Sequence, residues 1–187
     1  MTTIQSKHEI ITALQEISQQ VTDSVASLSD EHFNYNVDEN WSAAGYLKHL
    51  ILSVKPFARA IQLPKAVMGE RFGTRSDGSL TYDELVTQYD EKIAAGMRAE
   101  NAPNSVPVNY KFPDDVADDI QAYLIETWQQ ANQQLIDTLS GWSVDELDIY
   151  CLPHPALASI TIREMCFFTI HHNQVHHTDI QNAPHQS

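Results

Sequence analysis

The sequence predicts an all-α protein folded as a single four-helix bundle, and three observations carry this prediction. Glycine is scarce, with 6 in 187 residues, and apolar residues recur at spacings of three and four, the period of an α-helix. Four segments of about five turns or more each carry one apolar stripe, and no series of alternating strands accompanies them. Amphipathic helices of matched length bury their apolar faces best against one another. The length fits one domain, residues 1–187, with a polar tail from about residue 181.

The first two long helices follow from stripes and caps in the N-terminal third. The first covers about residues 5–28 and ends in a polar break that lasts to Asn40. The second begins after Ser42, a good N-cap residue. Pro56 lies inside it and predicts a kink or a shorter helix. Pro64 and Gly69 mark its end. Each stripe repeats every three or four residues: Ile11, Leu14, Ile17, Val21, Val25 and Leu28, then Leu47, Leu50, Val54, Phe57 and Ile61.

Residues 69–117 form a long, irregular connection between the second and third helices. ERFGTRSDGS is typical of a loop, whereas TYDE, starting at Thr81, is a capping box that predicts one short extra helix. The proline-rich NAPNSVPVNYKFPDD predicts extended or irregular backbone. A crossover this long allows the second and third helices to run parallel.

The C-terminal third supplies the other two long helices. The third is expected over about residues 115–139, with Gly141 as its stop. A second capping box, SVDE from Ser143, predicts one or two further turns. CLPHPALAS contains two prolines and predicts a loop, after which the last helix covers about residues 161–180.

Charge and cysteine content exclude several classes of protein. The net charge is −14, with no cluster of Lys and Arg, which argues against binding to nucleic acid or to an anionic membrane surface. Cys151 and Cys166 are too few for a disulfide framework and predict reduced thiols in a cytoplasmic protein. The N-terminus lacks the apolar core of a secretory signal, and no run approaches the ~20 apolar residues of a membrane-spanning helix.

The histidines are concentrated near the C-terminus, in the run IHHNQVHHTDI. Only His172 and His176 have i, i+4 spacing within it, so they share one face of the last helix. They continue the apolar stripe of that helix toward its C-terminal end, which predicts that both rings point into the bundle. Buried imidazoles need partners, and two rings one turn apart can converge on one cation, as in HExxH helices.

His49 is the candidate third ligand, on the flank of the second helix's stripe, if the second and last helices are neighbours. Three imidazoles leave one position open for water or substrate, which is typical of catalytic metal sites. A histidine-rich metal tract without chemistry and a metal-free, pH-sensitive cluster are the alternatives. The remaining histidines are expected to be exposed, hydrogen-bonded in the core or beside the ligands: His8, His32, His154, His171, His177 and His185.

Two segments together resemble the DinB-like metalloprotein superfamily over about residues 5–180. They are WSAAGYLKHL, starting at Trp41, and TIREMCFFTIHHNQVHHTDI, starting at Thr161. The family shows a WS…HL segment opening the second helix and an HxxxHxxQI segment in the last one. Matched by position, the resemblance makes His49, His172 and His176 the metal ligands.

The sequence departs from the family pattern at two positions. Asp179 stands where the family often has Gln, and we expect it either to accept a hydrogen bond from a ligand imidazole or to lie on the surface. Gly45 replaces a frequent Glu at the start of the second helix, a change that bears on the helix start rather than on the metal.

The resemblance also implies one divalent metal ion, typically zinc or nickel, and often a homodimer. Characterised relatives include transferases and isomerases that use low-molecular-weight thiols such as bacillithiol or mycothiol, and others are called metal-dependent hydrolases. We therefore expect a thiol-dependent S-transferase or a hydrolase acting on a small molecule, with a metal-bound water or thiolate as the reactive group. Thiol transfer is preferred because no Glu of the HExxH kind sits beside the ligands. The alternative is a non-catalytic, stress-related bundle that binds metal or a small ligand.

Overall fold

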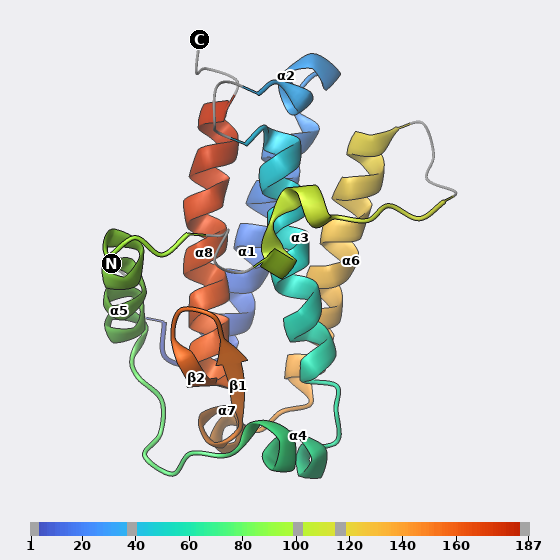
Figure 1. Ribbon diagram of the computed structural model, residues 1–187. Helices are drawn as coiled ribbons and strands as arrows, with labels where there is room; N and C mark the ends of the chain where they lie inside the picture. The colour runs from blue at the N-terminus through green and yellow to red at the C-terminus, as the bar shows by residue number, and fades with distance from the viewer. Residues whose placement is uncertain (1–3, 37–40, 99–102, 115–118, 184–187) are drawn as a thin grey trace.

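The computed structural model describes residues 4–36, 41–98, 103–114 and 119–183. Its centre is a bundle of four long helices: α1 (Lys7–Ala26), α3 (Ala43–Ala60), α6 (Ile120–Ser140) and α8 (Ile162–Asn182) (Figure 1). α1 and α3 each pack against both α6 and α8, so the four helices form a ring around one core. The all-α fold class predicted from the sequence is confirmed.

Shorter elements decorate the bundle at its ends and on one side. They are α2 (Asp30–Asn34), α4 (Lys65–Phe72), α5 (Tyr82–Ala94), the 3₁₀ turns η2 (Pro103–Ser105) and η3 (Pro107–Asn109), α7 (Val144–Ile149) and the strands β1 (Cys151–His154) and β2 (Ala158–Thr161). The two strands form an antiparallel hairpin in which Cys151 pairs with Thr161 and His154 with Ala158.

The four helices of the bundle are connected with a crossover, as their directions show. α3 and α6 run in one direction, whereas α1 and α8 run in the other (Figure 1). The connection from α3 to α6 passes through α4 and α5 and then crosses α3 through η2 and η3, which pack directly on that helix. The predicted long crossover between parallel second and third helices is therefore present. Its last part covers the middle of α3, where His49 lies.

Side-chain caps set the starts of most helices. Four of them open with a complete capping box, in which a Ser or Thr side chain and a Glu three residues later each bond the other's backbone N–H. The pairs are Ser6 and Glu9, Thr81 and Glu84, Ser143 and Glu146, and Thr161 and Glu164. The two boxes predicted from the sequence, at Thr81 and Ser143, are among them. Ser42 caps α3 as predicted, accepting a hydrogen bond from the Gly45 amide.

Several local predictions were wrong. The second helix does end shortly before Pro64, as predicted, but Pro64 is also the N-cap of a further helix, α4, and Gly69 lies inside α4 rather than at an end. A Pro is tolerated there because the first helical amides have no intrahelical partner, and burial of Met68 holds the helix against the core. A shortened second helix is not observed either, since α3 continues through Pro56 to Ala60.

The segment CLPHPALAS was predicted as a loop but forms the β1–β2 hairpin. Pro153 is compatible with a strand because the sheet has only two strands, and a Pro on an edge strand removes no needed donor. The polar break after α1 likewise contains the short helix α2, which buries Phe33. Neither element has a periodic signal of its own.

Two predicted boundaries fall partly outside the described residues. α6 begins at Ile120 with Asp119 as its N-cap, and residues 115–118 of the predicted third helix are outside the described part. The same holds for residues 184–187 of the predicted polar tail. Within the described ranges, no helix is both long enough and apolar enough to span a membrane.

Candidate metal centre

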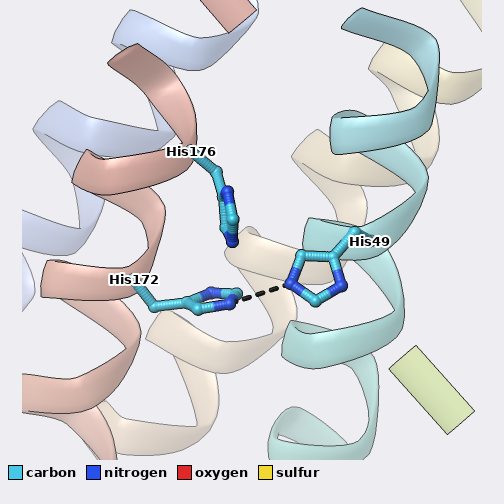
Figure 2. A group of neighbouring side chains, drawn as sticks. All are labelled: His49, His172 and His176. Carbon is cyan, nitrogen blue, oxygen red and sulfur yellow. Dashed lines mark hydrogen bonds between the residues drawn. The ribbon is translucent and has the colours of Figure 1, made fainter. Parts of the chain in front are cut away.

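His49, His172 and His176 meet between α3 and α8, where these two neighbouring helices run antiparallel (Figure 2). The ligand atoms of the three side chains all lie within 4.8 Å of one another. The Nε2 atoms of His49 and His172 are 2.9 Å apart. The His176 ring stands nearly perpendicular to both other rings, at centroid distances of 4.8 Å and 4.6 Å. The structure thus brings together the three residues that the sequence singled out.

Hydrogen bonds on the far side of two rings fix their orientation. The Nδ1 of His49 donates to the carbonyl oxygen of Ser105 over 2.6 Å. The Nδ1 of His176 donates to Oδ2 of Asp179 over 2.8 Å. Because each Nδ1 carries the proton, each Nε2 presents a lone pair toward the other two histidines. This is the arrangement that metal-binding histidines almost always have.

Burial keeps the imidazoles of His49 and His172 neutral. Loss of solvent and the nearby His176 lower the pKa of His49 to about 4. Burial, followed by the neighbouring histidines, lowers the pKa of His172 well below its ordinary value. A neutral imidazole is the form that binds a metal ion, so His49 and His172 are ready to bind at pH 7.

The donor set fits a divalent metal ion. A hydrogen bond between the facing Nε2 atoms of His49 and His172 can use only one proton, and it leaves the lone pair of His176 unused. One cation would satisfy all three inward nitrogens at once. Three imidazoles suit zinc, nickel, copper or iron, and they leave at least one coordination position open.

Aromatic side chains enclose the candidate centre on the α3 side. The Trp41 ring lies 5.0 Å from that of His49, and the Tyr46 ring 5.5 Å from that of His176. Trp41 can pack there because Gly45 has no side chain: a Cβ at position 45 would lie 2.9 Å from the Trp41 Cβ. The departure from the family pattern at Gly45 therefore shapes the wall of the site.

Of the other histidines, two that flank the ligands bind neighbouring helices instead. The Nε2 of His171 lies 3.0 Å from Oδ1 of Asp90 on α5. The Nε2 of His177 lies 2.8 Å from the hydroxyl of Ser24 on α1. They hold α8 against α5 and α1 and are not placed to bind the same ion. His185 lies outside the described residues.

A cavity of about 870 Å³ opens beside the three histidines. Its walls come from α3, α5, α8, the hairpin and the crossover segment, and most of its side chains are apolar or aromatic. They include Leu52, Phe57, Phe72, Ile93, Met165 and Phe168. This volume is within the range of pockets that take small molecules. A ligand in the cavity would have direct access to the candidate metal centre.

Two residues of the site, Ser105 and His154, were not predicted from the sequence. Ser105 supplies a backbone carbonyl from an irregular segment, so its identity carries no signal. His154 was expected to be a surface or hydrogen-bonded core histidine, and it is buried and hydrogen-bonded, but its position on the cavity wall was not foreseen. A His between two prolines, Pro153 and Pro155, was the available signal, because it marks a rigid turn.

The bundle, the three converging imidazoles and the adjoining cavity define a class: helical-bundle proteins with three histidines between two helices that could hold a metal ion. A family model described as the DinB superfamily matches residues 13–180, nearly the whole chain. The chain belongs to the DinB superfamily. No curated protein matches it significantly.

Proposed function

We propose that the protein is a metal-dependent enzyme that transfers a low-molecular-weight thiol to a small-molecule electrophile. His49, His172 and His176 hold one divalent ion, zinc or nickel, and the single observation behind the proposal is their convergence beside an apolar cavity. The ion, when bound, supplies Lewis acidity that lowers the pKa of a thiol or water at its open position. Ser105 and Asp179 hold the rings of His49 and His176 in the binding orientation.

The carboxylates around the cavity favour thiol transfer over hydrolysis. Activation of water for attack on an amide or ester is assisted by a free general base. Asp90 and Asp179 line the cavity, but each is hydrogen-bonded to a histidine. A thiol needs less assistance, since its ordinary pKa of about 8.5 is far below that of water.

The thiol would come from a cosubstrate, because the chain's own cysteines are unsuited to the role. Cys151 and Cys166 are both buried and unpaired. Burial raises the pKa of Cys166 to about 12 and also raises that of Cys151, so neither is a thiolate at pH 7. Neither residue lines the cavity beside the three histidines.

The expected partners and location belong to the same proposal. We propose a cytoplasmic homodimer that binds no nucleic acid and no membrane. The net charge of −14 supports the absence of an anionic partner, and the reduced cysteines support the compartment. Light scattering coupled to size-exclusion chromatography would determine the oligomeric state.

Metal content is the first test. Untagged protein, purified without a nickel column, would be analysed by elemental mass spectrometry beside a variant in which all three histidines are Ala. We expect about one equivalent in the wild type and none in the variant. Absence of metal from both, even after incubation with excess zinc or nickel, would overturn the proposal.

Activity is the second test. Metal-loaded protein would be supplied with a panel of thiols and electrophiles, with loss of thiol as the readout. We expect His176→Ala to weaken metal binding strongly and to abolish turnover, with little loss of helical content by circular dichroism. Turnover that survives without metal would contradict the mechanism. Metal binding without turnover of any pair would favour a non-catalytic metal-binding bundle.

A further inference from the structure

His154 ends strand β1 on the wall of the cavity, separated from the metal centre by one aromatic ring. The centroid of its ring lies 4.2 Å from that of Phe168, and the Phe168 centroid lies 4.9 Å from that of His172. The residue is 7% exposed. It is thus a buried polar side chain next to the reaction site, and it is not one of the three proposed ligands.

Hydrogen bonds of the hairpin turn determine which nitrogen of His154 carries the proton. Its Nδ1 accepts from the backbone amides of Ala156, at 3.2 Å, and Leu157, at 3.1 Å. A ring nitrogen that accepts cannot carry a proton, so the proton of the neutral ring sits on Nε2. Burial lowers the pKa of His154 to about 4, which keeps the ring in this neutral form at pH 7.

The Nε2–H donor of His154 has no hydrogen-bond partner within the described part of the chain, although the residue lines the cavity. This nitrogen is not fully enclosed by protein, so the donor is open to the cavity and can donate to an acceptor there. The turn alone explains the Nδ1 contacts. It does not explain why the other nitrogen is kept available at the cavity wall.

The charged side chains that line the cavity already have partners. Asp90 contacts His171, and Asp179 contacts His176. Arg98 donates to the carbonyls of Ile93 and Met97. The rest of the wall is mainly apolar, so a charged ligand body would lose its hydration without finding a counter-charge.

We propose that the cavity takes a neutral, largely apolar small molecule carrying a hydrogen-bond acceptor such as a carbonyl, and that His154 Nε2–H positions this acceptor. The inference rests on the proposed function for the ligand's role as the electrophilic substrate. His154 is then a positioning residue: it holds the acceptor one ring away from the three ligands. The apolar body of the molecule covers side chains such as Leu52, Phe57 and Ile93.

Two matched probes test this assignment by calorimetric binding. They are 4-phenylbutan-2-one, which has a carbonyl, and butylbenzene, which has nearly the same shape and no acceptor. Metal-free protein would be titrated first, so that no ion can bind the carbonyl, and zinc-loaded protein second. Wild type should bind both probes. His154→Asn should weaken the ketone about three- to tenfold and leave the hydrocarbon unchanged, the size expected for one hydrogen bond.

The choice of variants separates the donor from the turn. Asn keeps an acceptor for the Ala156 amide, as in an Asx turn, but has no group at the place of Nε2. Gln carries an N–H near that place and loses the turn acceptor. Preserved ketone affinity in His154→Gln, despite a lower melting temperature, is the expected rescue. A loss of ketone affinity in His154→Gln equal to or larger than that in His154→Asn would mean that a donor at the place of Nε2 does not bind the ketone, and would overturn the proposal.

Other outcomes distinguish this inference from the proposed function. A wild-type protein that binds neither probe would overturn the ligand class. Equal loss of both probes in His154→Asn would overturn the hydrogen bond. Full metal content with unchanged ketone affinity in His154→Asn would leave the enzyme proposal intact and remove this one. A protein that binds no metal but shows the expected probe selectivity would overturn the enzyme proposal and leave this inference intact.

Discussion

Asp179 is the residue whose role depends most directly on the metal. Its carboxylate accepts the Nδ1 proton of His176, and groups in this position typically contribute 10- to 100-fold to metal affinity. We expect Asp179→Ala to weaken zinc binding by about that factor, measured by competition with a chromophoric chelator. Asp137→Ala is the control, because Asp137 is an exposed carboxylate on α6 that bonds only Gln133 among the described residues. Equal affinities in the two variants would contradict the role of Asp179.

His154 should leave a signature in the pH dependence of stability. Its pKa is about 4 when folded, against about 6.5 in an unfolded chain. Between these values the unfolded state binds a proton that the folded state does not. The free energy of unfolding is therefore not reduced by His154 above pH 6.5. It falls as the pH is lowered from 6.5 toward 4, by about 3 kcal/mol in total.

Urea unfolding of metal-free protein between pH 4 and 8 would measure this contribution. We expect His154→Asn to flatten the slope by up to about 1.4 kcal/mol per pH unit below pH 6.5. His8→Asn makes the same substitution on the exposed face of α1 and serves as the control. A wild-type slope in His154→Asn would mean that the ring is not held neutral by burial.

The site residues differ in how far the sequence could reveal them. His172 and His176 are found by helical spacing, because a regular helix converts spacing into direction. His49 needs the further fact that α3 and α8 are neighbours, which only the assembled bundle supplies. Ser105 ends the 3₁₀ turn η2 and His154 ends strand β1, two short elements that the sequence did not predict, so their spacing indicated no direction.

At the scale of elements, the hairpin contains one strained residue. Ala158 has a φ of 61°, the left-handed region that costs an L-residue about 1–2 kcal/mol. Glycine relieves this cost but adds about 0.4–1 kcal/mol of unfolded-state entropy. We expect Ala158→Gly to raise the free energy of unfolding by up to about 1 kcal/mol, measured by urea titration.

Ala156→Gly is the matched control in the same hairpin. Ala156 does not have a positive φ, so its replacement by Gly adds the entropy cost without relieving any backbone strain. It should destabilise the protein by up to about 1 kcal/mol. Changes of the same sign in both variants would contradict strain at Ala158.

The capping box of α8 also anchors the loop before α5. The carboxylate of Glu164 is fully buried and accepts from the Thr161 and Leu80 amides and from Arg75. We expect Glu164→Gln to destabilise the protein by about 2 kcal/mol, since it leaves buried charge-assisted bonds unmade.

Glu84→Gln changes the same position of the α5 capping box, where the side chain is exposed. Gln can still cap there, so we expect little change in stability. Thermal and urea unfolding would compare the two variants. Similar losses would mean that burial of Glu164 adds nothing to the cap.

Helix starts were the most predictable features, because the residues of a capping box lie within four consecutive positions of the sequence. The boxes at Thr81 and Ser143 show this directly. α4 and the β1–β2 hairpin were not predictable in the same way. Met68 becomes a core residue only when α4 lies against the bundle, and β1 is held by backbone bonds such as that from Cys151 to the Gly73 carbonyl.

At the scale of the whole molecule, the sequence was sufficient to predict the helical bundle and the crossover between its second and third helices. Four stripes and one long connection determine both. The sequence could not indicate that the crossover lies over α3 and supplies the Ser105 carbonyl to His49. That contact arises from the path of the connection across the bundle, which η2 and η3 follow against α3.

Metal binding should change the stability of the whole bundle, because the ligands join α3 to α8. A metal at 1,000 times its dissociation constant stabilises the folded state by about 4 kcal/mol. For a chain of this size, that corresponds to a rise in melting temperature of about 8–16 °C. We expect this rise when zinc is added to chelator-stripped wild type, measured by circular dichroism at 222 nm.

The variant with Ala at His49, His172 and His176 should show no such rise, and a single His176→Ala should show a much smaller one. Two histidines, one on each helix, still meet in the single variant but bind the ion less tightly, so the coupling between α3 and α8 weakens without vanishing. If zinc raised the melting temperature of the triple variant as much as that of the wild type, the ion would be binding elsewhere. The link between these two helices would then owe nothing to metal.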